Sequence, residues 1–124
     1  MKLFSIFFGL ITLCTISLGE SKDPGDFRTH RLDSPHQVGE TTLRVLLPNN
    51  LEAGKRYRVL YVLPVHEDGE FRHGDGLKEV RKHDYHNKYE LICVAPSFTS
   101  QPWFADNDLN PKMHDESHML KTVL

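Results

Sequence analysis

Residues 57–63 read YRVLYVL, and residues 91–95 read LICVA. Both runs are rich in β-branched and aromatic side chains, and neither alternates between apolar and polar residues. A strand that is apolar on both faces is expected inside a sheet that is covered on both sides. Between the two runs, residues 76–90 carry apolar side chains at helical spacing, beginning with Leu77 and Val80. Strand, helix and strand at this spacing predict a βαβ unit with a right-handed crossover and a parallel pair of strands.

Three flanking segments extend this unit. Residues 27–33 predict a short first strand, and residues 113–124 have the apolar period of a helix. Residues 41–47 (TTLRVLL) alternate, which predicts a half-buried antiparallel strand near an edge of the sheet. Its apolar face would carry Leu43, Val45 and Leu47, and its polar face would carry Thr42 and Arg44.

The composition is that of a globular protein. The chain has 124 residues, of which 39% are hydrophobic and 26% charged, and its formal net charge is −2. This length allows one domain, and no repeat or bias supports a collagen, a coiled coil or a low-complexity protein. The negative balance also argues against a nucleic-acid partner bound through bulk charge. We predict an α/β domain over residues 40–124, preceded at 20–39 by a leader and the first strand.

Residues 1–19 (MKLFSIFFGLITLCTISLG) have the pattern of a secretory signal peptide, with the small residues Ser17 and Gly19 at a cleavage site. The alternative is an uncleaved membrane anchor, but the apolar run is short for a span of about 20 residues. We predict cleavage after Gly19 and a secreted or periplasmic protein that meets the membrane only transiently. Cleavage would also remove Cys14, and Cys93 alone could then form no disulfide within the chain.

Two long polar loops leave the carboxyl ends of the predicted parallel strands, at residues 64–76 and 96–112. In open α/β sheets, ligands bind beyond these ends of the strands. We therefore expect the two loops to line any binding site, although each single residue in them could equally belong to a solvated connection.

His114 and His118 are four residues apart, the spacing at which a helix can present two zinc ligands. A metalloprotease helix carries Glu directly after the first His, where this chain has Asp115, and a third ligand would be needed. A metal-dependent hydrolase that uses the two histidines is therefore the weaker alternative. We predict no metal site and no cofactor.

Nucleophilic catalysis has no clear motif. Ser97, Ser100 and Ser117 are available, but none lies in a Gly-x-Ser-x-Gly elbow. Cys93 falls within a predicted buried strand and is expected to be a small core residue. No glycine-rich phosphate-binding loop is found either. The motifs therefore assign no catalytic residue.

The order of the motifs over residues 40–124 resembles the N-terminal half of the esterase D-like branch of the α/β-hydrolases. In that family a strand ending in LLP precedes a strand similar to YRVLYVL, and a helix follows. A strand ending in VAP, a loop with Trp and Asp, and a helix with the pattern Glu-x-x-x-Leu come next. The matching segments here are Leu46–Pro48, Tyr57–Leu63, Val94–Pro96, Trp103–Asp106 and Glu116–Leu120.

This resemblance implies a three-layer fold and the hydrolysis of a carboxylic ester by a serine nucleophile. In the family, the backbone after the first buried strand helps to form the oxyanion hole, because fixed N–H groups stabilise developing negative charge. The matching stretch, Pro64–Asp68, departs from the family's His-Gly pattern. The aromatic residues of the second loop would form apolar walls on the substrate side. The site residues implied in this way are His66, Glu67, Asp68, Trp103 and Phe104.

The nucleophile elbow, acid and histidine of this family would follow the helix predicted at 113–124, and they are missing from this sequence. We therefore expect an incomplete domain, which could come from a truncated reading frame, from a gene split by a frameshift, or from a small protein that kept half of the fold. The predicted function is that of a secreted serine-esterase-like protein, inactive alone, with a small ester as substrate once completed. The alternative is a small exported α/β module that binds a ligand or partner through the same loops, or itself through an exposed sheet edge.

Overall fold

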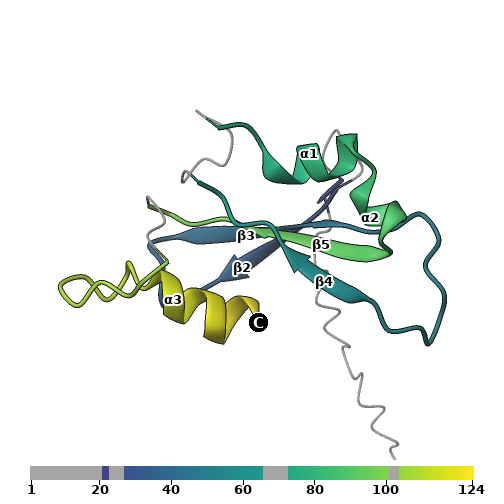
Figure 1. Cartoon of the computed structure of the whole chain (residues 1–124). Helices are drawn as coiled ribbons and strands as arrows, with labels where there is room; N and C mark the ends of the chain where they lie inside the picture. The colour runs from purple at the N-terminus through teal and green to yellow at the C-terminus, as the bar shows by residue number, and fades with distance from the viewer. Residues whose placement is uncertain (1–20, 23–26, 66–72, 101–103) are drawn as a thin grey trace, which may run out of the picture.

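The computed structural model describes residues 21–22, 27–65, 73–100 and 104–124, which form one mixed β-sheet with short helices (Figure 1). The signal peptide predicted at 1–19 lies outside these residues, as does most of the leader before Phe27. The order of strands in the sheet is β1-β2-β3-β5-β4. The strands are β1 (Ser21–Lys22), β2 (Arg28–Asp33), β3 (Glu40–Leu46), β4 (Arg58–Tyr61) and β5 (Leu91–Pro96). The helices are α1 (Gly76–Lys82), α2 (Tyr85–Lys88) and α3 (Asp115–His118), and α3 runs directly into a π-helical turn, η1 (Met119–Val123).

The pairing of the strands confirms the parallel pair that the sequence predicted for the two apolar runs. β4 and β5 pair in parallel, with Arg58 opposite Leu91 and Tyr61 opposite Val94. The other neighbours in the sheet, β1 with β2, β2 with β3, and β3 with β5, are all antiparallel. The chain between β4 and β5 carries α1 and α2, so the strand–helix–strand arrangement and the general α/β character are as predicted.

Two predictions about position in the sheet are wrong. The strand expected near an edge, β3, lies inside the sheet, because β2 pairs with it along its length and β5 covers its other side. The strand expected inside, β4, is the last strand of the described sheet. Its side chains Val59, Leu60 and Tyr61 remain 47%, 38% and 36% exposed. The apolar run was a correct sign of a strand, but it did not reveal which neighbours would cover it.

The helix predicted over residues 76–90 is broken into α1 and α2. The break lies at His83 and Asp84, where the backbone of Asp84 turns to a left-handed φ of 56°. Aspartate tolerates this conformation better than most side chains do. Asp84 also accepts a hydrogen bond of 2.6 Å from the side chain of Asn87, which supports the start of α2 after the break.

The apolar core lies between the sheet and α1. It contains four buried residues from four parts of the chain, Phe27, Leu46, Leu77 and Cys93, and Leu77 and Cys93 have no exposed surface. Cys93 is therefore the small core residue that the sequence predicted, and burial raises the pKa of its thiol. Figure 1 shows α1 and α2 on one side of the sheet and α3 on the other.

Leu77→Ala should lower the free energy of unfolding by about 2–5 kcal/mol, because it removes buried methyl groups from a packed core and leaves a cavity. The matched control is Leu109→Ala, whose side chain is 96% exposed and which should change stability by less than about 0.5 kcal/mol. Urea unfolding followed by circular dichroism measures both values. Equal losses in the two variants would contradict the location of the core.

Candidate functional site

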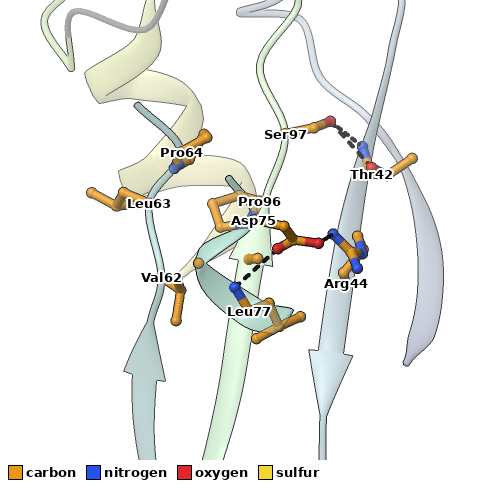
Figure 2. A pocket seen from close by; sticks show the side chains of 11 residues that line it. Thr42, Arg44, Val62, Leu63, Pro64, Asp75, Leu77, Pro96 and Ser97 are labelled. Atoms are coloured by element: carbon orange, nitrogen blue, oxygen red, sulfur yellow. Dashed lines mark hydrogen bonds and ion pairs between the residues drawn. The ribbon is translucent and has the colours of Figure 1, made fainter. Parts of the chain in front are cut away.

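A small cavity of about 140 Å³ opens at the carboxyl ends of β4 and β5, the place where the sequence predicted a ligand site (Figure 2). The chain that continues each strand forms two of its walls. The start of β3, which runs antiparallel to β5, and the start of α1 form the others. The lining residues are Thr42, Arg44, Val62, Leu63, Pro64, Asp75, Gly76, Leu77, Ala95, Pro96 and Ser97.

Local sequence explains why these elements meet. Alternation along β3 places Thr42 and Arg44 on the same face of the strand, as predicted, and both line the cavity. The expectation that this face is the polar one is wrong, because it also carries Leu46, the core residue of β3. Gly76 lets the start of α1 approach the chain that leaves β4. A Cβ atom on this glycine would lie only 2.7 Å from Cγ1 of Val62. The absence of a side chain at position 76 is therefore a packing requirement.

An ion pair between Arg44 and Asp75 crosses the cavity wall. Nη1 of Arg44 lies 2.7 Å from Oδ2 of Asp75, and the two side chains are only 20% and 7% exposed. The other carboxylate oxygen of Asp75 accepts hydrogen bonds from the backbone N–H groups of Leu77, at 2.9 Å, and Lys78, at 3.3 Å. Asp75 is therefore both the N-cap of α1 and the partner of a strand arginine (Figure 2).

The charge state of Asp75 follows from these contacts. Burial by itself would raise the pKa of the carboxyl. The hydrogen bond and the charge of Arg44, followed by the N–H groups of Lys78 and Leu77, outweigh burial and hold the pKa of Asp75 below its ordinary value. The guanidinium of Arg44 also lies 4.5 Å from the centre of the Phe27 ring, so the pair is packed against the core.

The second polar group in the cavity is the pair of hydroxyls of Thr42 and Ser97. Oγ of Ser97 accepts a 2.8 Å hydrogen bond from the backbone N–H of Thr42 and a 3.2 Å hydrogen bond from its hydroxyl. The backbone N–H of Ser97 in turn donates to the carbonyl oxygen of Thr42. Ser97 thus continues the pairing of β3 and β5 beyond the end of β5.

No activated nucleophile is formed within the described ranges. There, no serine hydroxyl makes a hydrogen bond to a histidine ring: Ser97 bonds to Thr42, and Ser117 bonds to Asp106 and Lys121. A serine needs an adjacent base to attack a carbonyl carbon. The cavity can therefore hold a small molecule by hydrogen bonds and charge, but its described residues contain no acyl-transfer machinery.

The site residues implied by the family resemblance are only partly placed. His66, Glu67, Asp68 and Trp103 lie outside the described residues. Phe104 is described: it is 40% exposed and packs edge-on against Phe98, with 5.6 Å between the ring centres. Other residues line the cavity, so its role as a substrate-side wall stays a prediction.

The predicted histidine pair is placed on the far side of the sheet from α1. The ring of His118 is fully buried, whereas Nε2 of His114 lies 3.0 Å from the carbonyl oxygen of Asn107. Across the part of the chain that the structure describes, no three histidine, cysteine or acidic side chains are grouped as a metal site requires.

Sequence reasoning missed Arg44 as a cavity residue; it placed Asp75 and Ser97 in the two loops expected to line a site but gave them no role there. A signal existed for each of them. Arg44 is the charged residue on the polar face of β3, Asp75 precedes a helix as an N-cap does, and Ser97 directly follows a strand. Nothing in the sequence pairs Arg44 with Asp75, however, because 31 positions separate them.

Replacing Asp75 separates its two contributions to stability. Asp75→Asn keeps an oxygen for the N-cap but removes the charge opposite Arg44, and we expect it to lower the free energy of unfolding by about 1.5–3 kcal/mol. Asp75→Ala removes the cap as well and should cost about 1 kcal/mol more. Urea unfolding at neutral pH measures both losses, and equal losses would contradict the capping role.

The same pair predicts a pH dependence. The pKa of Asp75 is lowered in the folded protein, so its contribution is complete above the ordinary aspartate value of about 3.9 and is lost as the pH falls below it. The difference in stability between the unaltered chain and Asp75→Asn should therefore shrink between about pH 5 and about pH 2. A difference that stays constant over this range would contradict the ion pair.

Comparison with known proteins gives no assignment: no family model, no curated protein and no solved structure matches this chain. No helix in the described stretches is long and apolar enough to cross a membrane. Function therefore has to be argued from the cavity and its residues.

Proposed function

We propose that this chain forms the sheet and one wall of the substrate site of an esterase-like α/β-hydrolase, and that it does not hydrolyse esters by itself. The observation that carries the proposal is the position of the cavity. It lies at the carboxyl ends of a parallel strand pair joined through helices, and the described serine in it, Ser97, is bonded to Thr42 instead of a histidine. The motif order over residues 40–124 supports the same origin.

The proposed lack of activity has a chemical basis in the cavity. Oγ of Ser97 accepts hydrogen bonds from Thr42, which withdraw electron density from the atom that would have to attack the ester. Pro64 stands at the start of the stretch that matches the oxyanion region of the family, and a proline has no N–H to donate. The described part of this wall therefore offers neither an activated nucleophile nor, at Pro64, a donor for an oxyanion.

A small exported binding module is the second candidate, and Arg44 favours it. Its guanidinium, which is paired with Asp75, lines the cavity beside two hydroxyl groups, and by sharing its N–H donors it could bind a small carboxylate weakly. The outer strand β4 adds a surface for self-association, because Val59 and Tyr61 are exposed on a strand that ends the described sheet. In this reading the ligand or a second copy, and not an ester, is the partner.

Hydrolysis of p-nitrophenyl acetate by the purified chain tests the first candidate. We expect no turnover above a buffer blank, for the unaltered chain and for the matched variant Ser97→Ala alike, because no base is placed beside the serine. Turnover that Ser97→Ala abolishes would make Ser97 a nucleophile and overturn the proposal. Turnover that persists in Ser97→Ala would also overturn the proposal, because another group of the chain would then hydrolyse the ester. Stabilisation by acetate without turnover, as a rise in the midpoint of thermal unfolding, would favour the binding module.

Export is proposed for both candidates on the sequence of residues 1–19. Expression of the full chain in a Gram-negative host should place the protein in the periplasm, with Glu20 as the first residue by N-terminal sequencing. Replacing the apolar Phe7 and Phe8 by Asp should keep the protein inside the cell and uncut. A full-length protein held in the membrane fraction would support the anchor instead.

A further inference from the structure

The segment formed by α3 and η1, residues 115–123, is held to the rest of the chain by polar contacts. Nε2 of Gln37 donates a buried hydrogen bond of 2.9 Å to Oδ1 of Asp115. Thr122 lies 3.2 Å from the hydroxyl of Ser34. Both partners belong to the turn between β2 and β3. By contrast, Leu120 at the middle of the segment is 58% exposed, so apolar burial contributes little there.

His118 is the exception within this polar attachment. Its side chain is completely buried, and neither of its ring nitrogens has a hydrogen-bond partner. The ring packs edge-on against Phe98, at 5.5 Å between the ring centres, and Phe98 is itself only 4% exposed. A buried polar group without a partner is rare and costly, and a buried charge without a partner is costlier still.

The charged and titratable groups around His118 do not remove this cost. From the turn between β2 and β3 it faces His36, and from its own helix it faces Asp115. Burial lowers the pKa of His118, and His36 acts in the same direction, while the backbone of Ser97 and the Asp115 carboxylate oppose them without cancelling the shift. Asp115 is already the acceptor for Gln37.

A second pair of imidazoles lies at the same attachment. The backbone N–H of His114 donates to the carbonyl oxygen of His36, at 3.1 Å, and the two rings stack with 6.4 Å between their centres. The turn between β2 and β3 and the segment therefore meet at this stacked pair as well as at the buried ring of His118.

We propose that the α3–η1 segment is an acid-released strap, which leaves the sheet when His118 takes up a proton from solvent. The imidazolium is disfavoured in the buried contact with Phe98, because neither ring nitrogen makes a hydrogen bond there and the backbone of Ser97 and the Asp115 carboxylate do not offset the burial. Release hydrates it and uncovers Phe98 and the turn at Ser34–Val38. Because the released state binds one more proton than the docked state, the docked state loses stability as the pH falls.

The expected change in the population of the released state follows from the linkage between release and proton binding. Below the ordinary histidine value of about 6.5, each further pH unit should raise the population of the released state by up to about tenfold, until the docked form also binds the proton. The strands β2, β3 and β5 contain no comparable buried imidazole, so they should keep their structure over the same range.

Hydrogen exchange of the full chain, read by mass spectrometry at about pH 7 and about pH 5 and corrected for the intrinsic pH dependence, tests this proposal. Peptides covering 114–124 should exchange faster at the lower pH, by up to about tenfold for each pH unit below about 6.5, and peptides from β3 and β5 should not change. His118→Phe keeps an aromatic ring against Phe98 and has no proton to gain, so it should retain protection in acid. His83→Phe is the matched control: its side chain is 52% exposed, and the variant should behave like the unaltered chain.

Three results would overturn the proposal. They are unchanged protection of 114–124 in the unaltered chain, loss of protection over the whole sheet at the same pH, and acid loss in His118→Phe equal to that of the unaltered chain. If His118→Phe does not fold, NMR titration of the His118 ring in the unaltered chain decides. A midpoint below the ordinary histidine value supports the strap, and one at or above that value overturns it.

Discussion

The ion pair of Asp75 with Arg44 is the interaction on which the rest of this structure depends. α1 is only seven residues long, and helices of this length are not stable in water on their own. Within it, Leu77 alone is fully buried. The carboxylate of Asp75 caps this helix with one oxygen and binds the guanidinium of a strand residue with the other, so it fixes the helix relative to the sheet. The core then forms because Leu77 is held above Cys93 and Leu46.

The same interaction limits what the cavity can do. The positive charge of Arg44 is largely neutralised by the carboxylate of Asp75, 2.7 Å away. A ligand in the cavity would therefore contact an ion pair with little net charge, and not an isolated cation. A bound anion would have to share the guanidinium with Asp75, which would weaken the attachment of α1. Binding at this site and the stability of the helix are therefore coupled. This coupling suits a site that recognises small polar molecules weakly better than it suits a site for a strongly charged ligand.

How far the sequence predicts this structure depends on the range over which each signal acts. Runs and alternation act over a few residues, and they predicted the four longer strands and the parallel pair. They did not predict that the face of β3 with Thr42 and Arg44 would also carry the core residue Leu46. The position of a strand in the sheet depends on partners elsewhere in the chain. For that reason the predicted positions of β3 and β4 were reversed: β3 lies inside the described sheet, and β4 lies at its edge. The break at Asp84 is a single left-handed residue, which a helical period over fifteen positions cannot detect.

The candidate site shows the same limit more strongly. The direction of the two loops placed it at the carboxyl ends of β4 and β5, but its decisive contact joins residues that no local pattern connects. The histidine spacing at His114 and His118 indicated one shared helix face, and that spacing is compatible with a metal. In the structure the two rings have separate surroundings, one beside a backbone carbonyl and the other against Phe98. The spacing of two residues on a helix shows whether their side chains could bind one ligand, but the burial and contacts of each side chain determine whether they do.

The two sides of the sheet are therefore held by forces of different kinds. On the side of α1, Phe27, Leu46, Leu77 and Cys93 exclude water from one another, an attraction that has no direction and hardly depends on pH. On the side of α3, the described attachment consists of single hydrogen bonds, a stacked pair of imidazoles and the edge-on contact of His118 with Phe98. Apolar residues of the terminal segment such as Leu124, which is 67% exposed, add little to it. A short chain with this division has one attachment that is permanent and one that its surroundings can control, and the buried ring of His118 is the point at which that control would act.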